Sequence, residues 1–465
     1  MLAQELALYA VRISKKFDID YLEARGEKYT KETFLMKNGV MDGGGFTTSE
    51  GIGIRVIVDG SVGFATTENL TKESVETAVE NAVKLAKGSL EKAHKVKFSK
   101  EKSVKSKWEV KEKKKIFDVD AKEKVSLLKH IDNLAKKAKL RMFQLSLFEN
   151  EKYFANTEGA RIYSRVPRVF LFYSVIVKGK RDVQRMLEYG GSGGWELVDS
   201  WNLDKKIPEE INALEKVSGA KKLKSEKMDV VLSPEIVGIA MHESVGHPSE
   251  ADRIFGREAA QAGESYLDES WKGRVMAEKF VNVVDDPTVK GSYGYYLYDD
   301  EGVKARRKFL IKNGKIHEFL HNRETAAVMK IKSNGSSRAE LYSREPIIRM
   351  SNTFMLPGDH SFDELIEGIK KGVYIKSYNE WNIDDKRWNE KYVGCEAYLI
   401  KNGEIVEPVF APVLEITTGQ FFKKIDALGK DLDFVAGVCG KGEPMQGVPV
   451  WFGGPHIRLR NVLIK

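Results

Sequence analysis

The sequence is poor in cysteine and has no long apolar run, and each absence excludes a class of protein. Its two cysteines, Cys395 and Cys439, cannot form a disulfide framework, and so few thiols are typical of a reducing compartment. No stretch approaches the roughly 18 apolar residues that a membrane-spanning helix needs. Residues 1–20 lack the features of a signal peptide, because Glu5 interrupts the apolar region and no small-residue cleavage site follows. We therefore expect a cytoplasmic protein without a membrane segment.

The excess of positive charge is confined to one segment. The 465 residues carry a formal net charge of +8, and residues 92–115 alone contain 11 Lys and 3 Glu. A nucleic-acid groove needs basic residues spread along a face with aromatic side chains between them. Phe98 and Trp108 are the only aromatic residues in this run. We interpret the segment as a solvated connector, with an electrostatic contact to an acidic partner as the alternative.

Length and hydrophobic content predict a globular protein of more than one domain. A chain of 465 residues is too long for one core, and 42% hydrophobic residues exclude a largely disordered chain. We predict an α+β fold with an N-terminal α/β region at 1–222 and a strand-rich C-terminal domain at 223–465. The first region comprises about 1–90 and 116–222, joined by the Lys-rich connector. Pro208 and the charged residues 221–227 mark the boundary.

Local patterns predict several elements of the N-terminal region. Residues 51–58 alternate like a strand, and Asp59-Gly60 is typical of a hairpin turn. Thr71 and Gly88 bound a predicted helix as N-cap and C′ residue. Further predictions are amphipathic helices near the N-terminus and at 119–140, strands at 142–157 and 168–179, and a flexible loop at 190–194. The Lys-Asn-Gly sequences at 312–314 and 401–403 predict hairpin turns in the C-terminal domain.

One helix of the C-terminal domain carries residues suited to metal chemistry. Ser233 and Pro234 are typical of a helix start, and the apolar residues 236–241 follow. The helix then delivers His242 and Glu243, with His247 five residues after His242. Neutral imidazoles are common zinc ligands, and a neighbouring carboxylate can accept a proton from water.

The five-residue spacing of the histidines does not fit a regular helix. It rotates the two rings by about 500°, which leaves them roughly 140° apart. A π-bulge would bring positions i and i+5 into line. Alternatively, the helix ends at Gly246 in a left-handed conformation and His247 swings back. Pro248 favours this second arrangement, because a residue before proline avoids the α region.

A catalytic zinc site needs a third protein ligand, and several residues are candidates. Cys439 lies in the glycine-rich run 437–442, which would expose a thiol, whereas Cys395 leads into a strand and is interpreted as a core residue. The spacing alone leaves open that both histidines are satisfied polar groups of a core. The other candidates for the third ligand are His456, His317, His321, Glu250 and Asp252.

Several blocks in the right order resemble the TldD/PmbA peptidase family over essentially the whole chain. The opening strands resemble the family at 50–67, and five further blocks do so in the C-terminal half. The differences are Pro248, where relatives commonly have glycine, and residues 377–394, which are charged and contain tryptophan where relatives are glycine-rich. The five matching C-terminal blocks are HESVGH at 242–247, YDDEG at 298–302, RMSNTFMLPG at 349–358, AYLIKNGEI at 397–405 and GVCGKGEPMQGVPV at 437–450.

The resemblance implies a zinc peptidase and assigns roles to individual residues. It places the zinc ligands at His242, His247 and Cys439 and the catalytic base at Glu243. It further implies unfolded peptides as substrates, cleaved in an enclosed cavity that forms with a paralogous TldE/PmbA-like subunit or with a second copy of the chain. An extended peptide is expected to add as a strand to an exposed sheet edge.

Two other functions and one pair of residues stay open. A nucleic-acid-binding or topoisomerase-binding modulator is the first alternative, and confinement of the charge to one connector argues against it. A zinc amidase acting on small molecules is the second. Asp299 and Asp300 orient a ligand or the substrate, or they are surface carboxylates of a turn. No substrate-binding residue is predicted.

Overall fold

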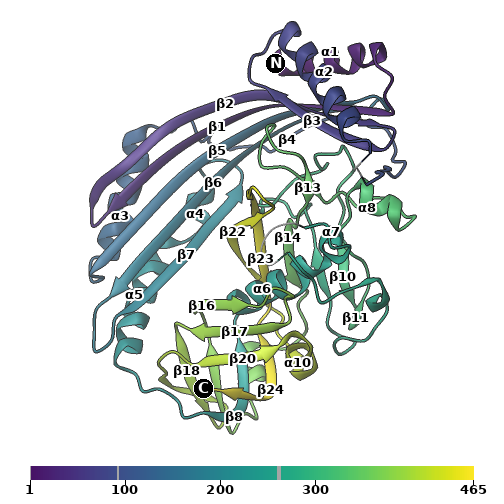
Figure 1. Cartoon of the computed structure of the whole chain (residues 1–465). Helices are drawn as coiled ribbons and strands as arrows, with labels where there is room; N and C mark the ends of the chain where they lie inside the picture. Colours follow the sequence, from purple (N-terminus) through teal and green to yellow (C-terminus); the bar gives the residue numbers. More distant parts are fainter. Residues whose placement is uncertain (1, 92–93, 259–262) are drawn as a thin grey trace.

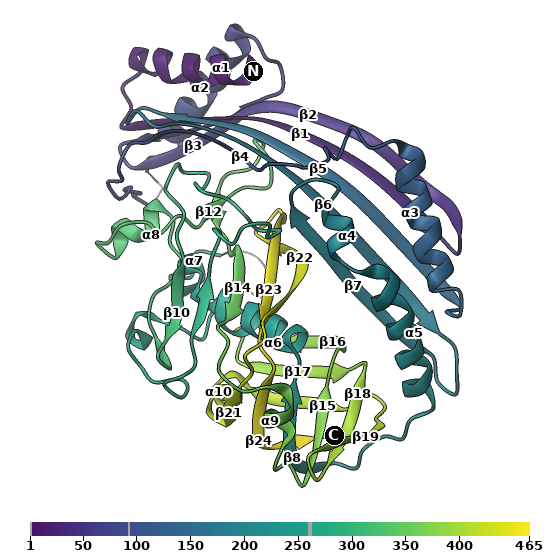
Figure 2. The same ribbon diagram turned by 180° about the vertical axis from the view of Figure 1, so that it is seen from behind.

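The chain has the predicted α+β fold, in which a long curved sheet from the N-terminal half arches over the C-terminal half (Figure 1). The computed structural model describes residues 2–91, 94–258 and 263–465. Seen from behind, the helices of the N-terminal half lie on the side of the curved sheet away from the C-terminal half (Figure 2). None of the helices in the described ranges combines the length and hydropathy of a membrane span.

The curved sheet has seven strands in the order β3-β2-β1-β5-β6, with β4 and β7 pairing with different parts of β6. The strands β1, β2, β5 and β6 are unusually long, which allows one sheet to span the molecule. The bounds are β1 Tyr21–Lys37, β2 Val40–Val58, β3 Ser61–Thr67, β4 Lys105–Glu109, β5 Leu140–Asn156, β6 Arg161–Val177 and β7 Val183–Ser192.

One face of this sheet is covered by helices, and the other faces the C-terminal half. In β1, Leu22 and Ala24 belong to the core beneath α1 and α2, and Met36 belongs to the core beneath α3 and α5. These even-numbered residues point to one side because strand side chains alternate. Arg25 points to the other side, where it donates to the carbonyl of Leu341. The helices are α1 Leu2–Ile13, α2 Lys72–Gly88, α3 Ala121–Leu134, α4 Leu197–Ser200 and α5 Leu203–Gly219.

Most short-range predictions for this half are confirmed. The hairpin turn between β2 and β3 has positive φ at Asp59 and Gly60. The Thr71 hydroxyl accepts from the amide of Ser74 and caps α2. The helix includes Gly88 and ends one residue later than predicted, and α3 ends at Leu134, before the predicted position 140. For these elements the type was therefore predicted correctly, with errors at the ends.

Three predictions for this half are wrong because distant pairing or burial decides the structure. The Lys-rich segment, of which 94–115 lie within the described residues, is more than a connector, since Lys105–Glu109 forms β4 beside β6. Gly190–Ser192 belongs to β7 instead of a loop, and a Cβ at Gly190 would lie 3.0 Å from the Cβ of Ala436. Pro208 lies inside α5, whose buried apolar stripe outweighs the missing N–H.

The C-terminal half contains two larger sheets. A nine-stranded sheet has the order β16-β17-β20-β24-β8-β15-β18-β19, with β21 beside β24, and a six-stranded sheet has the order β11-β10-β9-β14-β23-β22. The strands of the larger sheet are β8 Glu226–Leu232, β15 Lys371–Ile375, β16 Tyr378–Ile383, β17 Asn389–Gly394, β18 Ala397–Lys401, β19 Glu404–Pro408, β20 Val413–Thr417, β21 Ile425–Leu428 and β24 Ile457–Ile464.

The six-stranded sheet and the connecting helices complete this half. Its strands are β9 Val283–Asp285, β10 Lys308–Lys312, β11 Lys315–Ile316, β14 Asn352–Met355, β22 Asp433–Lys441 and β23 Gln446–Gly454, and a small ladder joins β12 Ser337–Arg338 to β13 Ile347–Ile348. The short helices are α7 Ala251–Ile254, α8 Arg323–Val328, α9 Phe362–Ile366 and α10 Thr418–Lys424. The predicted turns before β11 and β19 are confirmed by positive φ at Asn313, Gly314, Asn402 and Gly403.

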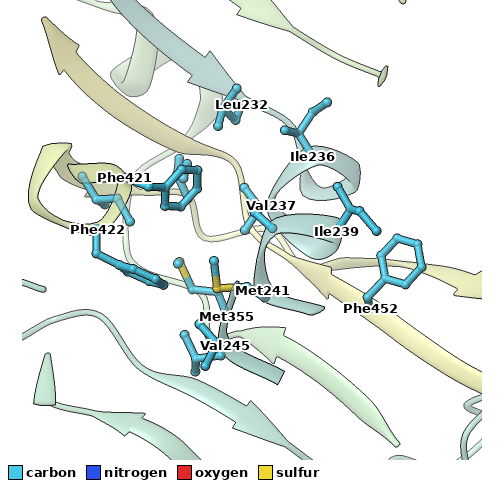
Figure 3. Close-up of a cluster of buried hydrophobic side chains, with 14 of the residues drawn as sticks. Leu232, Ile236, Val237, Ile239, Met241, Val245, Met355, Phe421, Phe422 and Phe452 are labelled. Atoms are coloured by element: carbon cyan, nitrogen blue, oxygen red, sulfur yellow. The ribbon is translucent and has the colours of Figure 1, made fainter. Parts of the chain in front are cut away.

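Helix α6, Pro234–Met241, lies in the centre of the C-terminal half and positions the site. Ile236, Val237 and Ile239 pack against apolar side chains from several strands and from α10 (Figure 3). Gly238 lets α6 approach β23 closely, since a Cβ there would lie 2.7 Å from the amide nitrogen of Gly453. A helix buried all round is held rigidly, so the residues that follow it are placed accurately.

Candidate metal centre

The turn that follows α6 is a π-helical turn at His242–Gly246, continued by a 3-10 turn at His247–Ser249. The amide of His247 donates to the carbonyl of His242, which is the i to i+5 bond of a π-helix. The two imidazole rings consequently lie side by side, with centroids 4.9 Å apart and planes at 83°. The π-bulge, the arrangement that Pro248 argued against, is the one observed.

Gly246 is needed for space and does not adopt the predicted left-handed conformation. Its φ of −61° and ψ of −64° are right-handed. A Cβ at this position would lie 1.9 Å from the sulfur of Met350. The glycine therefore allows the π-helical turn to pack against the strand region that follows β13.

Cys439 approaches this turn from a distant part of the chain. It lies on β22, and its buried Sγ is 3.4 Å from Nε2 of His247. One donor atom each from His242, His247 and Cys439 lie within 4.8 Å of one another. Nδ1 of His242 is buried and has no hydrogen-bond partner within the described part of the chain. Two imidazoles and a thiol are a donor set that suits zinc, so these residues fit such an ion.

The buried carboxylate of Glu250 orients His247 by contacting the ring nitrogen that does not face Cys439. Oε2 of Glu250 lies 3.0 Å from Nδ1 of His247, so that Nε2 faces Cys439. Carboxylates commonly hold a metal-binding histidine in this way. Arg253 donates to Glu250 at 2.7 Å, and Lys441 lies 3.3 Å from it. Lys441 is two residues from Cys439 on β22. Its ion pair with Glu250 therefore connects β22 to the turn that carries His242 and His247.

Burial and neighbouring charges favour the protonation states that bind a metal. Burial lowers the pKa of both His242 and His247, which keeps the imidazoles neutral. Burial raises the pKa of the Cys439 thiol, but His247 and Arg349 outweigh it and lower that pKa to about 7. Arg349 also donates to the carbonyl of Cys439, which anchors the β22–β23 hairpin.

Glu243 lies next to His242 and is 4% exposed. Its carboxylate forms an ion pair with Arg387, from the turn between β16 and β17. The same turn region is tethered to the site by Glu390, which accepts hydrogen bonds from Ser244 and from the Thr418 hydroxyl. The segment at 377–394 therefore supplies the ion-pair partner of Glu243 and a second contact to the same turn.

The site opens into a cleft of about 570 Å³ lined by residues of three sheets. Strand β7 contributes Met186 and Glu188, β16 contributes Tyr378, and β22 contributes Val435 and neighbouring residues. Strands β16 and β22 are the end strands of their sheets, and β7 lies beyond β6 at the border of the curved sheet. Three strand edges therefore meet at the cleft.

The other predicted ligands lie elsewhere or have other partners. His456 pairs with Asp431, His321 is hydrogen-bonded to Thr325, and His317 is exposed. Asp252 pairs with Lys441, and Glu250 supports His247. Arg387, Lys441 and Arg349 were missed, because nothing in their local sequence indicates that they contact residues about 90 to 190 positions away. Cys395 is buried among apolar side chains of the N-terminal half, as its strand context predicted.

Two histidines and a cysteine converge on one point, with a buried carboxylate next to one of them in the chain, which is a set of groups typical of metal-dependent hydrolases, and known proteins of similar sequence place the chain among the metallopeptidases. A metalloprotease of Methanocaldococcus jannaschii is 32% identical over 451 residues, covering 96% of this chain and 98% of that protein. A zinc metalloprotease TldD homolog of Saccharolobus solfataricus is 32% identical over 264 residues, covering 57% of this chain and 55% of that protein.

The chain belongs to the PmbA/TldA metallopeptidase family. The family's domain 1 matches residues 22–86, its central domain matches 114–222 and its C-terminal domain matches 225–465. The crystal structure of TldE from Thermococcus kodakarensis has the same fold, with a TM-score of 0.77 at 18% identity and 99% of both chains covered.

Proposed function

We propose that this metallopeptidase uses zinc to hydrolyse unfolded peptides, with His242, His247 and Cys439 as the zinc ligands. The observation that carries the proposal is the convergence of their three donor atoms within 4.8 Å from two distant stretches of chain. The relative from Saccharolobus solfataricus is named as a zinc enzyme, which favours this ion. Residues 223–465 would carry the chemistry, and residues 1–222 would form the opposite wall of the cleft.

Glu243 is proposed as the catalytic base. Zinc in such a site supplies Lewis acidity, lowering the pKa of water towards neutrality and polarising the scissile carbonyl. Glu243 adjoins a proposed ligand and lines the cleft, so its carboxylate can accept a proton from water and pass it to the leaving amine. Arg387 forms an ion pair with this carboxylate and fixes its orientation.

The form of the cleft favours a peptide substrate in an extended conformation. Such a chain can add as a strand to the edge of β22 or β16, where hydrogen bonds to the main chain tolerate many side chains. A cleft of this size, bordered by strand edges, supports a peptide better than the small amide of an amidase. A TldE-like subunit or a second copy of the chain is the proposed partner that encloses it.

Metal analysis combined with a peptide-cleavage assay tests this function. We expect Glu243→Gln to retain zinc and to lose at least about 100-fold of its activity, because it lacks the base. His242→Ala, His247→Ala and Cys439→Ser should each lose zinc. Cys395→Ser is the matched control, since this cysteine lies in a different core, and it should retain zinc. Full activity in Glu243→Gln would refute the role of Glu243 as the base. Zinc retention in Cys439→Ser would refute the assignment of Cys439 as a ligand.

A further inference from the structure

A second cavity of about 340 Å³ lies beside the metal-site cleft, beneath the same face of the curved sheet. On β6, Arg168 and Phe170 line this cavity, whereas Phe172 lines the cleft. Val438, the neighbour of Cys439, lines both. The two spaces are therefore neighbours along β6, separated in part by the β22–β23 hairpin.

The walls of this second cavity are largely aromatic. Trp108 of β4 meets Tyr295 edge to face at 5.9 Å, and Phe170 stacks on Tyr293 at 5.4 Å. Nε1 of Trp108 is buried and has no hydrogen-bond partner among the residues described. Strand β4, which forms within the Lys-rich segment, thus contributes the aromatic ring of Trp108 to the wall. The indole N–H of this residue is a hydrogen-bond donor that a ligand could use.

Two buried arginines that face the cavity have no carboxylate partner among the residues that the structure describes. Arg168 is 9% exposed and donates to the carbonyls of Tyr293 and Tyr295. Within 2–91, 94–258 and 263–465, no carboxylate oxygen lies within 4.0 Å of its guanidinium.

Arg338 is in the same situation. It is 6% exposed, donates to the carbonyls of Met350 and Pro449, and likewise has no carboxylate within ion-pair distance in the described ranges. Burial lowers the pKa of Arg168 to about 10 and that of Arg338 as well, with mutual repulsion adding to the effect at Arg168. Both side chains stay charged near neutral pH. Buried charges are normally paired, so a ligand that brings a negative charge would relieve the cost of burying them.

The acidic residues that line the cavity either have hydrogen-bond or ion-pair partners already or are exposed to solvent. Asp300 pairs with Lys152 and accepts from the amide of Ala339. Asp299 accepts from the amides of Glu301, Val303 and Ser337, so its role is to hold its turn. Glu340 is exposed to solvent. Of the two alternatives for Asp299 and Asp300, that of surface carboxylates of a turn is contradicted for Asp299, which is buried, whereas Asp300 is partly buried and paired with Lys152.

We propose that this cavity binds an organic carboxylate with an aromatic or apolar body, whose carboxylate pairs with Arg168 and Arg338. The aromatic walls accommodate the body, and guanidinium groups are well suited to carboxylates. Arg25 and Lys152 also line the cavity, but each already lies within 4.0 Å of Asp300, so Arg168 and Arg338 are the buried cations best placed to pair with an added carboxylate. The carboxylate can come from a free small acid or from the C-terminus of a peptide held in the cleft, and the second source depends on the proposed function.

Calorimetry on the full chain with two matched probes tests the site. We expect N-acetyl-phenylalanine to bind at least tenfold more tightly than N-acetyl-phenylalanine amide, which has the same body without the charge. Arg168→Gln and Arg338→Gln should each remove this preference, and Arg306→Gln, at an exposed arginine paired with Glu318, should preserve it. If a variant fails to fold, the difference in affinity between the acid and the amide on the unmodified protein decides the question. Equal binding of acid and amide, or no binding of either, would overturn the proposal.

A second experiment distinguishes the sources of the carboxylate. The cavity and the cleft share Val438, so the C-terminus of a short peptide held in the cleft can reach the cavity. If the peptide is the source, short peptide substrates should have a lower KM as free acids than as amides, with equal kcat. Identical KM values together with tight binding of N-acetyl-phenylalanine would assign the site to a free acid. Absence of any cleavage would count against the proposed peptidase function, while the calorimetric result would still report on the cavity.

Discussion

Replacing Glu250 with Gln tests whether this carboxylate orients His247 for metal binding. The side chain is fully buried and contacts His247 at 3.0 Å, Arg253 at 2.7 Å and Lys441 at 3.3 Å. Removing a carboxylate behind a metal-binding histidine typically weakens metal affinity 10- to 100-fold. We therefore expect the Kd for zinc to rise by that factor, about 1.4–2.7 kcal/mol, in a competition titration against a chelating dye.

The substitution also disturbs a buried charge cluster, so its effect on stability must be separated from its effect on the metal. Asp252→Asn is the matched control, because Asp252 also pairs with Lys441, at 2.7 Å, but supports neither proposed histidine ligand. Thermal unfolding without metal should show a loss of about 1–3 kcal/mol in both variants. Only Glu250→Gln should lose zinc affinity. Equal Kd values for zinc in the two variants would refute the orienting role of Glu250.

Three further predictions concern the surroundings of the site. Gly246→Ala should lower the free energy of unfolding by about 1–3 kcal/mol in denaturant titrations, because its Cβ would collide with Met350, and unchanged stability would contradict that packing. Arg387→Gln should lower kcat/KM by roughly 10- to 100-fold while zinc content is unchanged, because Glu243 loses the ion pair that fixes its orientation, and an unchanged kcat/KM would exclude the ion pair from catalysis. Burial raises the pKa of Glu390 to about 7 from 4.5, so the folded protein holds a proton that the unfolded chain releases, and stability falls as pH rises between these values. Glu390→Gln should remove about 3 kcal/mol of that fall, measured as unfolding free energy near pH 5 and pH 8.

Short-range patterns predicted the elements whose structure depends on neighbours in sequence. The turn at Asp59-Gly60 and the cap at Thr71 follow from backbone preferences that act over two to four residues. Residues 105–109 and 190–192 were misread because each becomes a strand only through pairing with β6. Pro208 was misread because burial of one helix face decides α5, and burial depends on distant partners.

The sequence by itself determined which side chains could form the site, since His242, Glu243 and His247 stand out by type and spacing and the family resemblance added Cys439. Only the tertiary structure decided that the histidines share a π-helical turn, because Met350 leaves no room for a side chain at Gly246 and the buried α6 holds the turn in place. It also decided the partners Glu250, Lys441 and Arg387, and it brought Arg168 and Arg338 to one cavity. The physical reason is that electrostatic contacts between buried groups depend on distance in space, and strand pairing together with the packing of α6 and of the connecting turns brought these residues together.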